Sequence, residues 1–293
     1  MEKPIIYTSE WLAKTPETIG VAKAIFAALD ELQIEHRELK NTKDYWCRDY
    51  MPVCVSKSYG MYTRYKYSPD YLIDYKTKQK YITEQEDACK SIMEHLSDYM
   101  DIVFDGGNYV RCGNKVIMTD KIFSENPQIS ANTLLTDLQW NLLWPIIILL
   151  PWDMKEPYGH SDGMVAYLGD NKILLTGYWK QRNKKYHKRL LKILSAHFEV
   201  VELPDWKGSD TWCYINYLQV PGGILLPCLS EDFSCESDVA AIETFGKLFP
   251  DSRIMPIYAY PLIKNGGAIH CVTWEKYPNR DIVFSDPACA FEK

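Results

Sequence analysis

The residues of this sequence best suited to covalent chemistry are a cysteine, a histidine and several aspartates. Cys271 ends the segment GGAIHC, and His160 lies with Asp162 in YGHSDGM. Asp49 lies in WCRDYMP, and Asp105 begins DGGNY. A cysteine can act as a nucleophile, a histidine can carry protons, and paired carboxylates can hold a cation. The chain therefore contains the parts of a covalent catalytic site for a cationic substrate.

Other polar and aromatic residues lie in comparable settings. Asn216 belongs to CYINY, and Trp46 and Arg48 flank Asp49. Taken alone, each residue has an ordinary structural explanation, since Asp105 before two glycines suits a turn and Asp49 could pair with Arg48. Cysteine is also among the residue types most often buried. Only their occurrence at equivalent places of a repeat favours a functional explanation.

That repeat is a strand–turn–strand pattern with a period near 50 residues. Three segments are typical of β-hairpins with a glycine-containing turn: 108–119, 164–177 and 215–227. Apolar residues at i, i+3, i+4 and i+7 also predict five amphipathic helices, which span 15–33, 84–100, 130–143, 184–198 and 236–249. A short apolar strand follows each helix.

Five units of hairpin, helix and strand can close around an axis, so that a loop from every unit reaches the centre. The candidate residues lie in those loops, each at the start of a unit. We therefore predict an α/β protein with pseudo-fivefold ββαβ repeats around a central polar pocket. The sequence contains no linker, so we expect a single catalytic domain over residues 1–293.

The composition limits the classes of partner. The formal net charge is −6 with no basic tail, which argues against nucleic acid and mildly favours a cationic partner. The most apolar segment, 142–152, is too short to span a membrane, and the N-terminus lacks a signal-peptide pattern. Nine cysteines without Cys-x-x-Cys spacing indicate reduced thiols. We expect a cytoplasmic protein with neither a nucleic-acid nor a membrane partner.

In order and approximate spacing, WCRDYMP, DGGNYV, GHSDGM, INY and GGAIHC resemble the motifs of a known family. It is the agmatine deiminase and bacterial (Porphyromonas-type) peptidylarginine deiminase family of the guanidine-modifying, or pentein, superfamily. The resemblance runs from about Trp46 to Thr273. It implies a five-bladed α/β-propeller that deiminates a guanidino compound hydrolytically, without a metal or an organic cofactor.

The resemblance implies catalytic roles for three residues. Cys271 would be the nucleophile that forms a covalent thiouronium adduct. His160 would act first as general acid and then as general base, and Asp105 would orient it.

The resemblance also implies how the substrate is held. Asp49 and Asp162 would clamp the guanidinium nitrogens, and Asn216 matches a polar site residue of the bacterial peptidylarginine enzymes. Trp46 would cover the bound side chain. Arg48 would either orient Asp49 or meet the substrate.

Three departures from the family pattern leave the substrate open. Met51 replaces a glycine, and Asp105 replaces the glutamate of agmatine deiminases. Trp274 and Glu275 replace two glutamines after the cysteine motif. The reaction class is compatible with these changes.

The glycine pair before Cys271 has a predicted purpose. Gly266 and Gly267 would leave the backbone room near the substrate and let Cys271 point into the pocket. Because neighbours in a strand point to opposite faces, we expect His270 to face away and to be structural.

The leading prediction is deimination of a small cationic guanidino compound such as agmatine. Deimination of arginine in peptides or proteins is the second interpretation. Amidino transfer and a pentein that binds without turnover are weaker alternatives. A homo-oligomer is compatible with the sequence.

Overall fold

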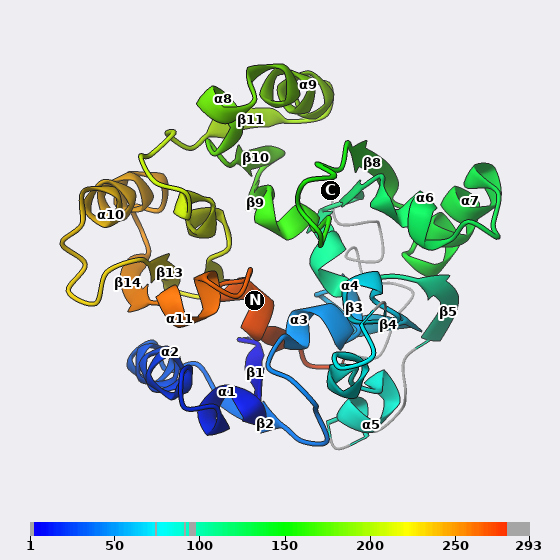
Figure 1. The fold of residues 1–293 in the computed structure, drawn as a ribbon, viewed down its shortest axis with the longest axis horizontal. Coiled ribbons are helices and arrows are strands. Elements are labelled where there is room, and N and C mark those ends of the chain that lie inside the picture. Colours follow the sequence, from blue (N-terminus) through cyan, green and yellow to red (C-terminus); the bar gives the residue numbers. More distant parts are fainter. Residues whose placement is uncertain (1–2, 74, 91, 94–97, 280–293) are drawn as a thin grey trace.

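The computed structural model describes residues 3–279 except 74, 91 and 94–97. Its strands form five three-stranded sheets. In each sheet, the middle strand pairs antiparallel with one neighbour and parallel with the other. The sheets surround a common centre, and the longer helices lie outside them (Figure 1). The fold is the five-bladed α/β-propeller that the repeat and the resemblance predict.

The first four sheets follow the chain in order. The first sheet consists of β3 (Val53–Ser56), β4 (Met61–Lys66) and β5 (Asp98–Val103), and the second of β6 (Val110–Cys112), β7 (Lys115–Thr119) and β8 (Ile146–Leu150). The third sheet consists of β9 (Val165–Gly169), β10 (Lys172–Leu175) and β11 (Glu199–Glu202), and the fourth of β12 (Leu218–Val220), β13 (Gly223–Cys228) and β14 (Arg253–Tyr258).

The fifth sheet joins the two ends of the described chain. It consists of β15 (Trp274–Lys276), β1 (Ile5–Ser9) and β2 (His36–Leu39). Ile5 pairs with Lys276 and Tyr7 with Trp274. Backbone groups of β1 that would otherwise form an open sheet edge are thereby paired, which closes the ring of sheets.

One helix in each unit leads from the middle strand to the third strand. These helices are α2 (Ile19–Glu31), α5 (Gln85–Cys89), α7 (Ala131–Asn141), α9 (Lys184–Leu194) and α10 (Glu236–Leu248). Shorter helices lie between these elements: α1 (Glu10–Lys14), α3 (Cys47–Tyr50), α4 (Asp70–Ile73), α6 (Lys121–Glu125), α8 (Trp179–Arg182) and α11 (Tyr260–Ile263). None of the helices in the described ranges has both the length and the hydropathy needed to cross a membrane.

The predicted helix over 84–100 is wrong in its extent. Helix α5 ends at Cys89, and β5 already begins at Asp98. In β5 the side chains of Met100 and Ile102 are buried whereas Asp101 between them is exposed. This alternation has the period of a strand, and it outweighs the helical pattern of the preceding residues. The other four predicted helices lie within the predicted ranges.

The core lies between the sheets and their outer helices. Val116, Ile173 and Ile224 are each the second residue of a middle strand, and all three are completely buried. Leu134 and Leu138 of α7 pack in the same apolar cluster as Val116. Burial of such a side chain stabilises the fold by roughly 1.5–3 kcal/mol.

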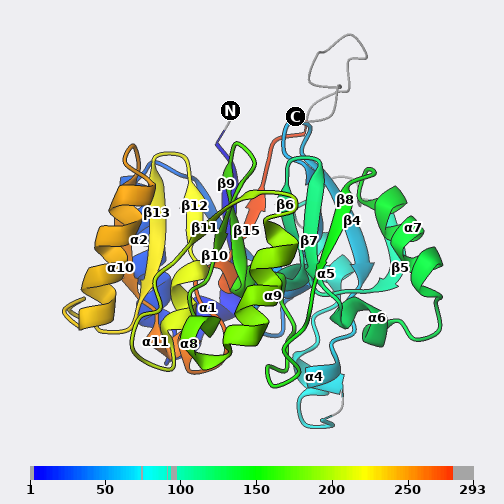
Figure 2. The ribbon, with the colours of Figure 1, turned by 90° about the horizontal axis from the view of Figure 1, so that it is seen from above.

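A short helical turn precedes the first strand of every sheet. The turns are α3, three 3₁₀ helices at Gly106–Asn108, Ser161–Gly163 and Thr211–Ile215, and a fourth at His270–Val272. Figure 2 shows the strands side by side, with α4 projecting from one end of the molecule. The five turns contain or adjoin the candidate site residues.

Candidate active site

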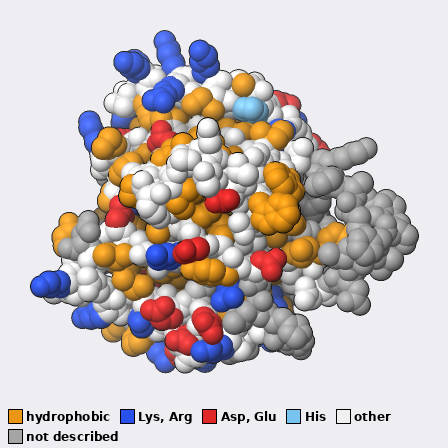
Figure 3. All heavy atoms as spheres, turned by 90° about the vertical axis from the view of Figure 1, so that its right-hand side faces the viewer, with side chains coloured by type: hydrophobic (Ala, Val, Ile, Leu, Met, Phe, Trp, Pro, Cys, Tyr) orange, Lys and Arg blue, Asp and Glu red, His pale blue; other side chains and the backbone are white. Residues whose placement is uncertain are grey.

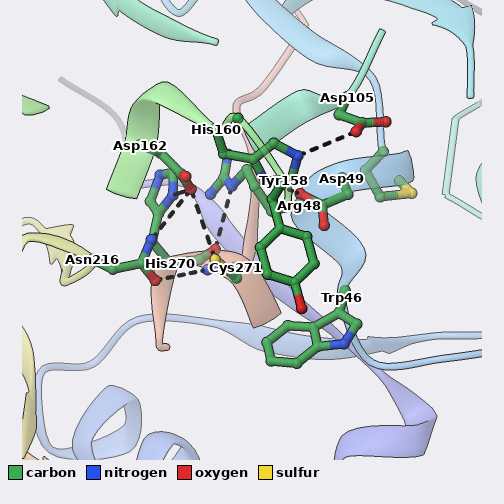
Figure 4. Close-up of polar contacts among 12 residues, drawn as sticks. Trp46, Arg48, Asp49, Asp105, Tyr158, His160, Asp162, Asn216, His270 and Cys271 are labelled. Atoms are coloured by element: carbon green, nitrogen blue, oxygen red, sulfur yellow. Dashed lines mark hydrogen bonds and ion pairs between the residues drawn. The ribbon is translucent and has the colours of Figure 1, made fainter. Parts of the chain in front are cut away.

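The central turns bring the predicted residues together (Figure 4). Asn216 connects three of the turns. Its carbonyl oxygen accepts a hydrogen bond from the backbone N–H of His270 at 3.1 Å, and its Oδ1 accepts one from that of Cys271 at 3.3 Å. Its Nδ2 donates to Oδ2 of Asp162 at 3.3 Å. Asn216 therefore holds the backbone of Cys271 in place relative to Asp162.

The Cys271 thiol lies beside a carboxylate. Its side chain is buried, and Sγ is 3.9 Å from Oδ2 of Asp162. Burial raises the pKa of the Cys271 thiol well above its ordinary value, and the charges of Asp162 and Asp49 raise it further. The cysteine is consequently a protonated thiol at neutral pH when no cationic substrate is bound.

His160 lies between two carboxylates. Nε2 is 3.2 Å from Oδ2 of Asp105, and Nδ1 is 3.6 Å from Oδ1 of Asp49. Burial by itself would lower the pKa of His160. The charge of Asp49 and the hydrogen bond to Asp105 outweigh burial and raise that pKa to about 10. The imidazole is therefore a cation, able to donate a proton.

The carboxylates of this site have unused acceptor capacity. Oδ1 of Asp49 and Oδ1 of Asp105 are buried without a hydrogen-bond partner among the described residues. Burial raises the pKa of Asp49 above its ordinary value, an effect that the Asp105 and Asp162 charges reinforce and the neighbouring His160 charge opposes. Buried acceptors without donors are costly, so a cation carrying N–H groups in the cavity that Asp49 lines would relieve the charge and the missing hydrogen bond of Asp49.

His270 contacts the site, contrary to the prediction that it faces away. Its Nδ1 lies 2.6 Å from Oδ2 of Asp162. The prediction assumed a strand, but His270 and Cys271 belong to a 3₁₀ helix, in which neighbours do not alternate between two faces. Burial alone would raise the pKa of Asp162; the hydrogen bond and charge of His270, together with the charges of His160 and Arg48, outweigh it and keep that pKa below its ordinary value. Adjacency to Cys271 was the only sequence signal for this residue.

Arg48 has a partner that the sequence did not suggest. Its Nη2 lies 2.6 Å from Oε2 of Glu275, and its Nε donates to the carbonyl oxygen of His270 at 3.4 Å. The hydrogen bonds of the Arg48 guanidinium thus go to Glu275 and to the main chain of His270, and none within the described part of the chain goes to Asp49. Burial would raise the pKa of Glu275, yet the charge and hydrogen bond of Arg48, with the charges of Lys57 and His270, lower it to about 2.

The remaining departures from the family pattern lie in the core. Met51 is completely buried, and Trp274 is nearly so. The Trp274 indole donates to the carbonyl oxygen of Pro52 at 2.8 Å and packs against Tyr7 and Tyr62. Both residues thus join the first sheet to the fifth.

Glycines allow aromatic and catalytic groups to approach the backbone. A Cβ on Gly267 would overlap the ring of Trp46, and a Cβ on Gly107 would overlap Nδ1 of His160. The room that was expected beside the substrate at Gly267 is therefore occupied by Trp46. Figure 4 shows Trp46 and Tyr158 next to one another in front of Cys271.

The site opens into two adjoining cavities of about 880 and 940 Å³. Tyr158, His160 and Cys271 line both of them. Asp162 lines the first and Asp49 the second. A ligand in this space can reach the cysteine, the histidine and both carboxylates.

A propeller of five ββαβ units with this central constellation defines a member of the guanidine-modifying pentein superfamily. Residues 11–277 match the model of the Porphyromonas-type peptidyl-arginine deiminases. The chain belongs to that family, in agreement with the resemblance of its motifs.

Individual relatives agree with this membership. Agmatine deiminase from Pseudomonas putida is 24% identical over 309 residues, which cover 89% of this chain and 83% of the relative. Relatives from Enterococcus faecalis and Legionella pneumophila are 23% and 25% identical. The chain spans only 60% and 62% of the length of those two relatives.

Solved structures show the same fold. The C. jejuni agmatine deiminase superposes with a TM-score of 0.72 at 14% identity, covering 95% of this chain and 94% of that one. The agmatine deiminase of Enterococcus faecalis gives a TM-score of 0.68 at 19% identity, covering 94% and 93%. A Cys-to-Ser mutant of DDAH from Pseudomonas aeruginosa gives a TM-score of 0.57 at 11% identity, covering 94% of this chain and 100% of that one.

Proposed function

We propose that this protein hydrolyses a guanidino compound to a ureido product and ammonia through a covalent adduct on Cys271. The observation that carries the proposal is one buried thiol and one imidazolium that line two adjoining cavities, with the carboxylate of Asp162 in one cavity and that of Asp49 in the other. The family membership supports it. So does the structure of a Cys-to-Ser variant of the C. jejuni agmatine deiminase with substrate bound, which superposes with a TM-score of 0.68 at 14% identity.

Substrate binding would prepare the nucleophile. A guanidinium held by Asp49 and Asp162 places a positive charge beside the two carboxylates that raise the pKa of Cys271. That charge offsets theirs, lowers the pKa of the thiol and promotes loss of its proton. Binding of the substrate therefore generates the thiolate on which the reaction depends.

The first half of the reaction forms the adduct. The Cys271 thiolate attacks the guanidinium carbon, forming a C–S bond and a neutral tetrahedral intermediate. The His160 imidazolium then protonates one nitrogen, the C–N bond breaks, and ammonia leaves. A cationic thiouronium remains on Cys271, and His160 is neutral. Asp105, 3.2 Å from Nε2, would orient the ring during this transfer.

The second half of the reaction releases the product. Neutral His160 accepts a proton from water as the oxygen attacks the thiouronium carbon. The C–S bond breaks, the Cys271 thiolate returns, and the protonated ureido group loses a proton. One guanidinium and one water thus yield one urea and one ammonium ion.

Agmatine is the first candidate substrate, because several relatives carry that activity in their names. Arginine within a peptide is the second candidate, because the family model that matches this chain is that of the Porphyromonas-type peptidyl-arginine deiminases. Five lysines line the two cavities, but so do Asp44, Asp153 and Glu156, so the charge of the lining does not separate the two candidates.

A panel of guanidino compounds tests the proposal. Agmatine, free arginine, an N-acylated arginine amide and an arginine-containing peptide are incubated with the protein, and both ammonia and ureido product are measured. Equal amounts of the two products establish deimination. Amidine transferred to an added amine without ammonia would instead establish an amidinotransferase, and binding without either product a non-catalytic pentein.

We also propose that the chain is a single domain over residues 1–293 that works in the cytoplasm. The eight described cysteines are all free thiols, as expected in a reducing compartment. The domain is supported by the pairing of β1 with β15, because a ring closed by both ends leaves no separable half.

We propose, in addition, that the chain self-associates through the end of α7. The face of the molecule that carries α6 and α7 has hydrophobic side chains at its surface (Figure 3). Trp140 and Trp144 are 67% and 54% exposed and stack edge to face, with Leu143 and Ile146 also exposed. Exposed aromatic patches typically mark interfaces, and in a twofold dimer one patch meets its own copy. Light scattering of Trp140→Glu against wild type tests this; equal masses would contradict it.

A further inference from the structure

Lys121 is a buried lysine that lies outside the proposed reaction. It begins α6, and its side chain is only 1% exposed. Its Nζ lies 2.9 Å from Oδ1 of Asp70, 2.9 Å from the carbonyl oxygen of Tyr158 and 3.1 Å from Oε1 of Glu125. An ammonium has three N–H donors, so these three contacts can use all of them. Lysines are rarely buried unless paired in this way.

One partner lies directly before the proposed general acid. The carbonyl oxygen of Tyr158 belongs to the main chain two residues ahead of His160. Glu156 binds the same segment from the other side, because its carboxylate accepts from the backbone N–H groups of Tyr158 at 2.9 Å and Gly159 at 2.6 Å. The segment that leads into His160 is thus fixed by two charged side chains, Lys121 and Glu156.

The second partner belongs to α4. This helix has no buried residue and projects from one end of the molecule (Figure 2). Asp70, its first residue, binds Lys121, and the ring of Tyr71 is 5.0 Å from that of Tyr158 and 6.1 Å from that of His160. Tyr71 also lines the cavity that contains Asp49. Helix α4 therefore forms part of the cavity wall. Because none of its residues is buried, few contacts hold it in place.

Aromatic rings complete the surroundings of the ammonium. The Nζ of Lys121 lies 5.4 Å from the ring centroid of Tyr71 and 5.6 Å from that of Trp152. The Trp152 indole donates to the carbonyl oxygen of Glu156 at 2.8 Å. The ammonium of Lys121, on α6, consequently contacts Asp70 and Tyr71 of α4. It also contacts both ends of the segment 152–158, through the Trp152 ring and the carbonyl oxygen of Tyr158.

We infer that Lys121 is a positioning residue for the deimination site: it holds α4 as a wall of the substrate cavity and the main chain that places His160. The inference rests on the proposed function. Lys121 acts through other groups, because its own side chain is buried beneath the cavity. Small displacements of a catalytic group are costly, since a misplacement of about 1 Å can reduce the rate by about a hundredfold.

Two variants distinguish the contact of Lys121 with Asp70 on α4 from its contact with the main chain at Tyr158. Lys121→Met retains the length of the side chain as far as Cε but removes Nζ and its three donors. Asp70→Ala removes only the connection to α4, and Asp70 is 48% exposed, so this variant is expected to fold. Steady-state kinetics of a guanidino substrate and hydrogen–deuterium exchange without substrate are measured for both, and for the double variant.

The expected kinetic result is a split between KM and kcat. Asp70→Ala raises KM by about tenfold with kcat within about twofold of wild type, because the cavity wall is loosened while His160 stays in place. Lys121→Met raises KM similarly and also lowers kcat by about tenfold or more. The double variant has the KM of Lys121→Met, since both changes break one contact. Exchange rises in 69–73 in both variants, and in 157–160 only in Lys121→Met.

A buried acid elsewhere supplies the control. Asp238 on α10 is completely buried and accepts hydrogen bonds from the backbone N–H groups of Leu229 and Ser230, each at 2.8 Å. Asp238→Asn is expected to lower Tm while kcat and KM stay unchanged. If the Lys121 and Asp70 variants likewise lowered only Tm, with kinetics and local exchange unchanged, the positioning role would be overturned.

The two hypotheses can fail separately. A wild-type protein that deiminates no guanidino compound refutes the proposed function, whereas the exchange measurement still tests what Lys121 holds. If Lys121→Met does not fold, unchanged KM and exchange in Asp70→Ala overturn the inference, and a raised KM supports it.

Discussion

Nδ1 of His270 lies 2.6 Å from Oδ2 of Asp162, the same oxygen that is 3.9 Å from Sγ of Cys271. The histidine next to the proposed nucleophile thus reaches a carboxylate proposed to hold the substrate. This contact is the largest of the effects that together keep the pKa of Asp162 below its ordinary value despite burial. It also yields a prediction about pH.

Replacement of His270 by alanine should move the acid limb of kcat/KM to higher pH. Asp162 must be ionised to hold a guanidinium, and its ionised form is favoured by His270 in the folded protein. Without His270 the pKa of Asp162 rises, so activity is lost at a higher pH as the solution is acidified. The pH profile of kcat/KM measures the change. His36→Ala, which removes a surface histidine 3.1 Å from Asp30, is the control and should leave the profile unchanged.

Replacement of Cys271 by alanine should abolish turnover while the fold persists. The alanine variant lacks the nucleophile, and only a small, buried side chain is shortened. Ammonia release and circular dichroism check the two expectations. Cys235→Ala, at the half-buried N-cap of α10, should remain active. Turnover by Cys271→Ala at the wild-type rate would show that another residue is the nucleophile.

Alkylation offers a second measurement on the same thiol. Because burial and two carboxylates raise the pKa of Cys271, iodoacetamide should label it slowly at neutral pH and faster as the pH rises. Bound substrate should protect it from labelling by filling the cavity. Mass spectrometry of the peptide that contains Cys271 follows the modification. Rapid labelling at neutral pH without substrate would contradict the raised pKa.

Replacement of Asp49 or Asp162 by asparagine should lower kcat/KM by more than about tenfold. The change removes a charge with almost no change of shape, and loss of one partner of a desolvated charge pair typically costs about 2–5 kcal/mol. Asp232→Asn is the matched control, since Asp232 caps an exposed turn through Ser234. If all three variants had similar kinetics and differed only in Tm, Asp49 and Asp162 would be structural.

The order of substrates should follow charge. Free arginine carries an α-carboxylate, and Arg48, the arginine of the site motifs, is already bound to Glu275. We therefore expect agmatine and an N-acylated arginine amide to exceed free arginine in kcat/KM under one buffer. A blocked arginine ahead of agmatine would favour arginine within a peptide as the substrate. Free arginine ahead by tenfold would refute this order.

Much of the fold could be predicted from the sequence because the repeat is local. Val116, Ile173 and Ile224 have equivalent places because each hairpin needs a buried middle strand. The motifs around Cys271 and His160 could be recognised for the same reason, since each occupies a few consecutive residues. The helix predicted over 84–100 was wrong beyond Cys89, because residues 98–103 form β5 and have the alternating burial of a strand.

Other features were decided by tertiary structure alone. Arg48 and Glu275 are far apart in the chain, and only the pairing of β1 with β15 closes the ring that joins them. Likewise, His270 faces Asp162 because a 3₁₀ turn replaced the expected strand. Residue types and short spacings determine which chemical groups a chain can offer. Which groups meet, and the pKa values that burial and neighbouring charges then impose, depend on contacts between distant segments.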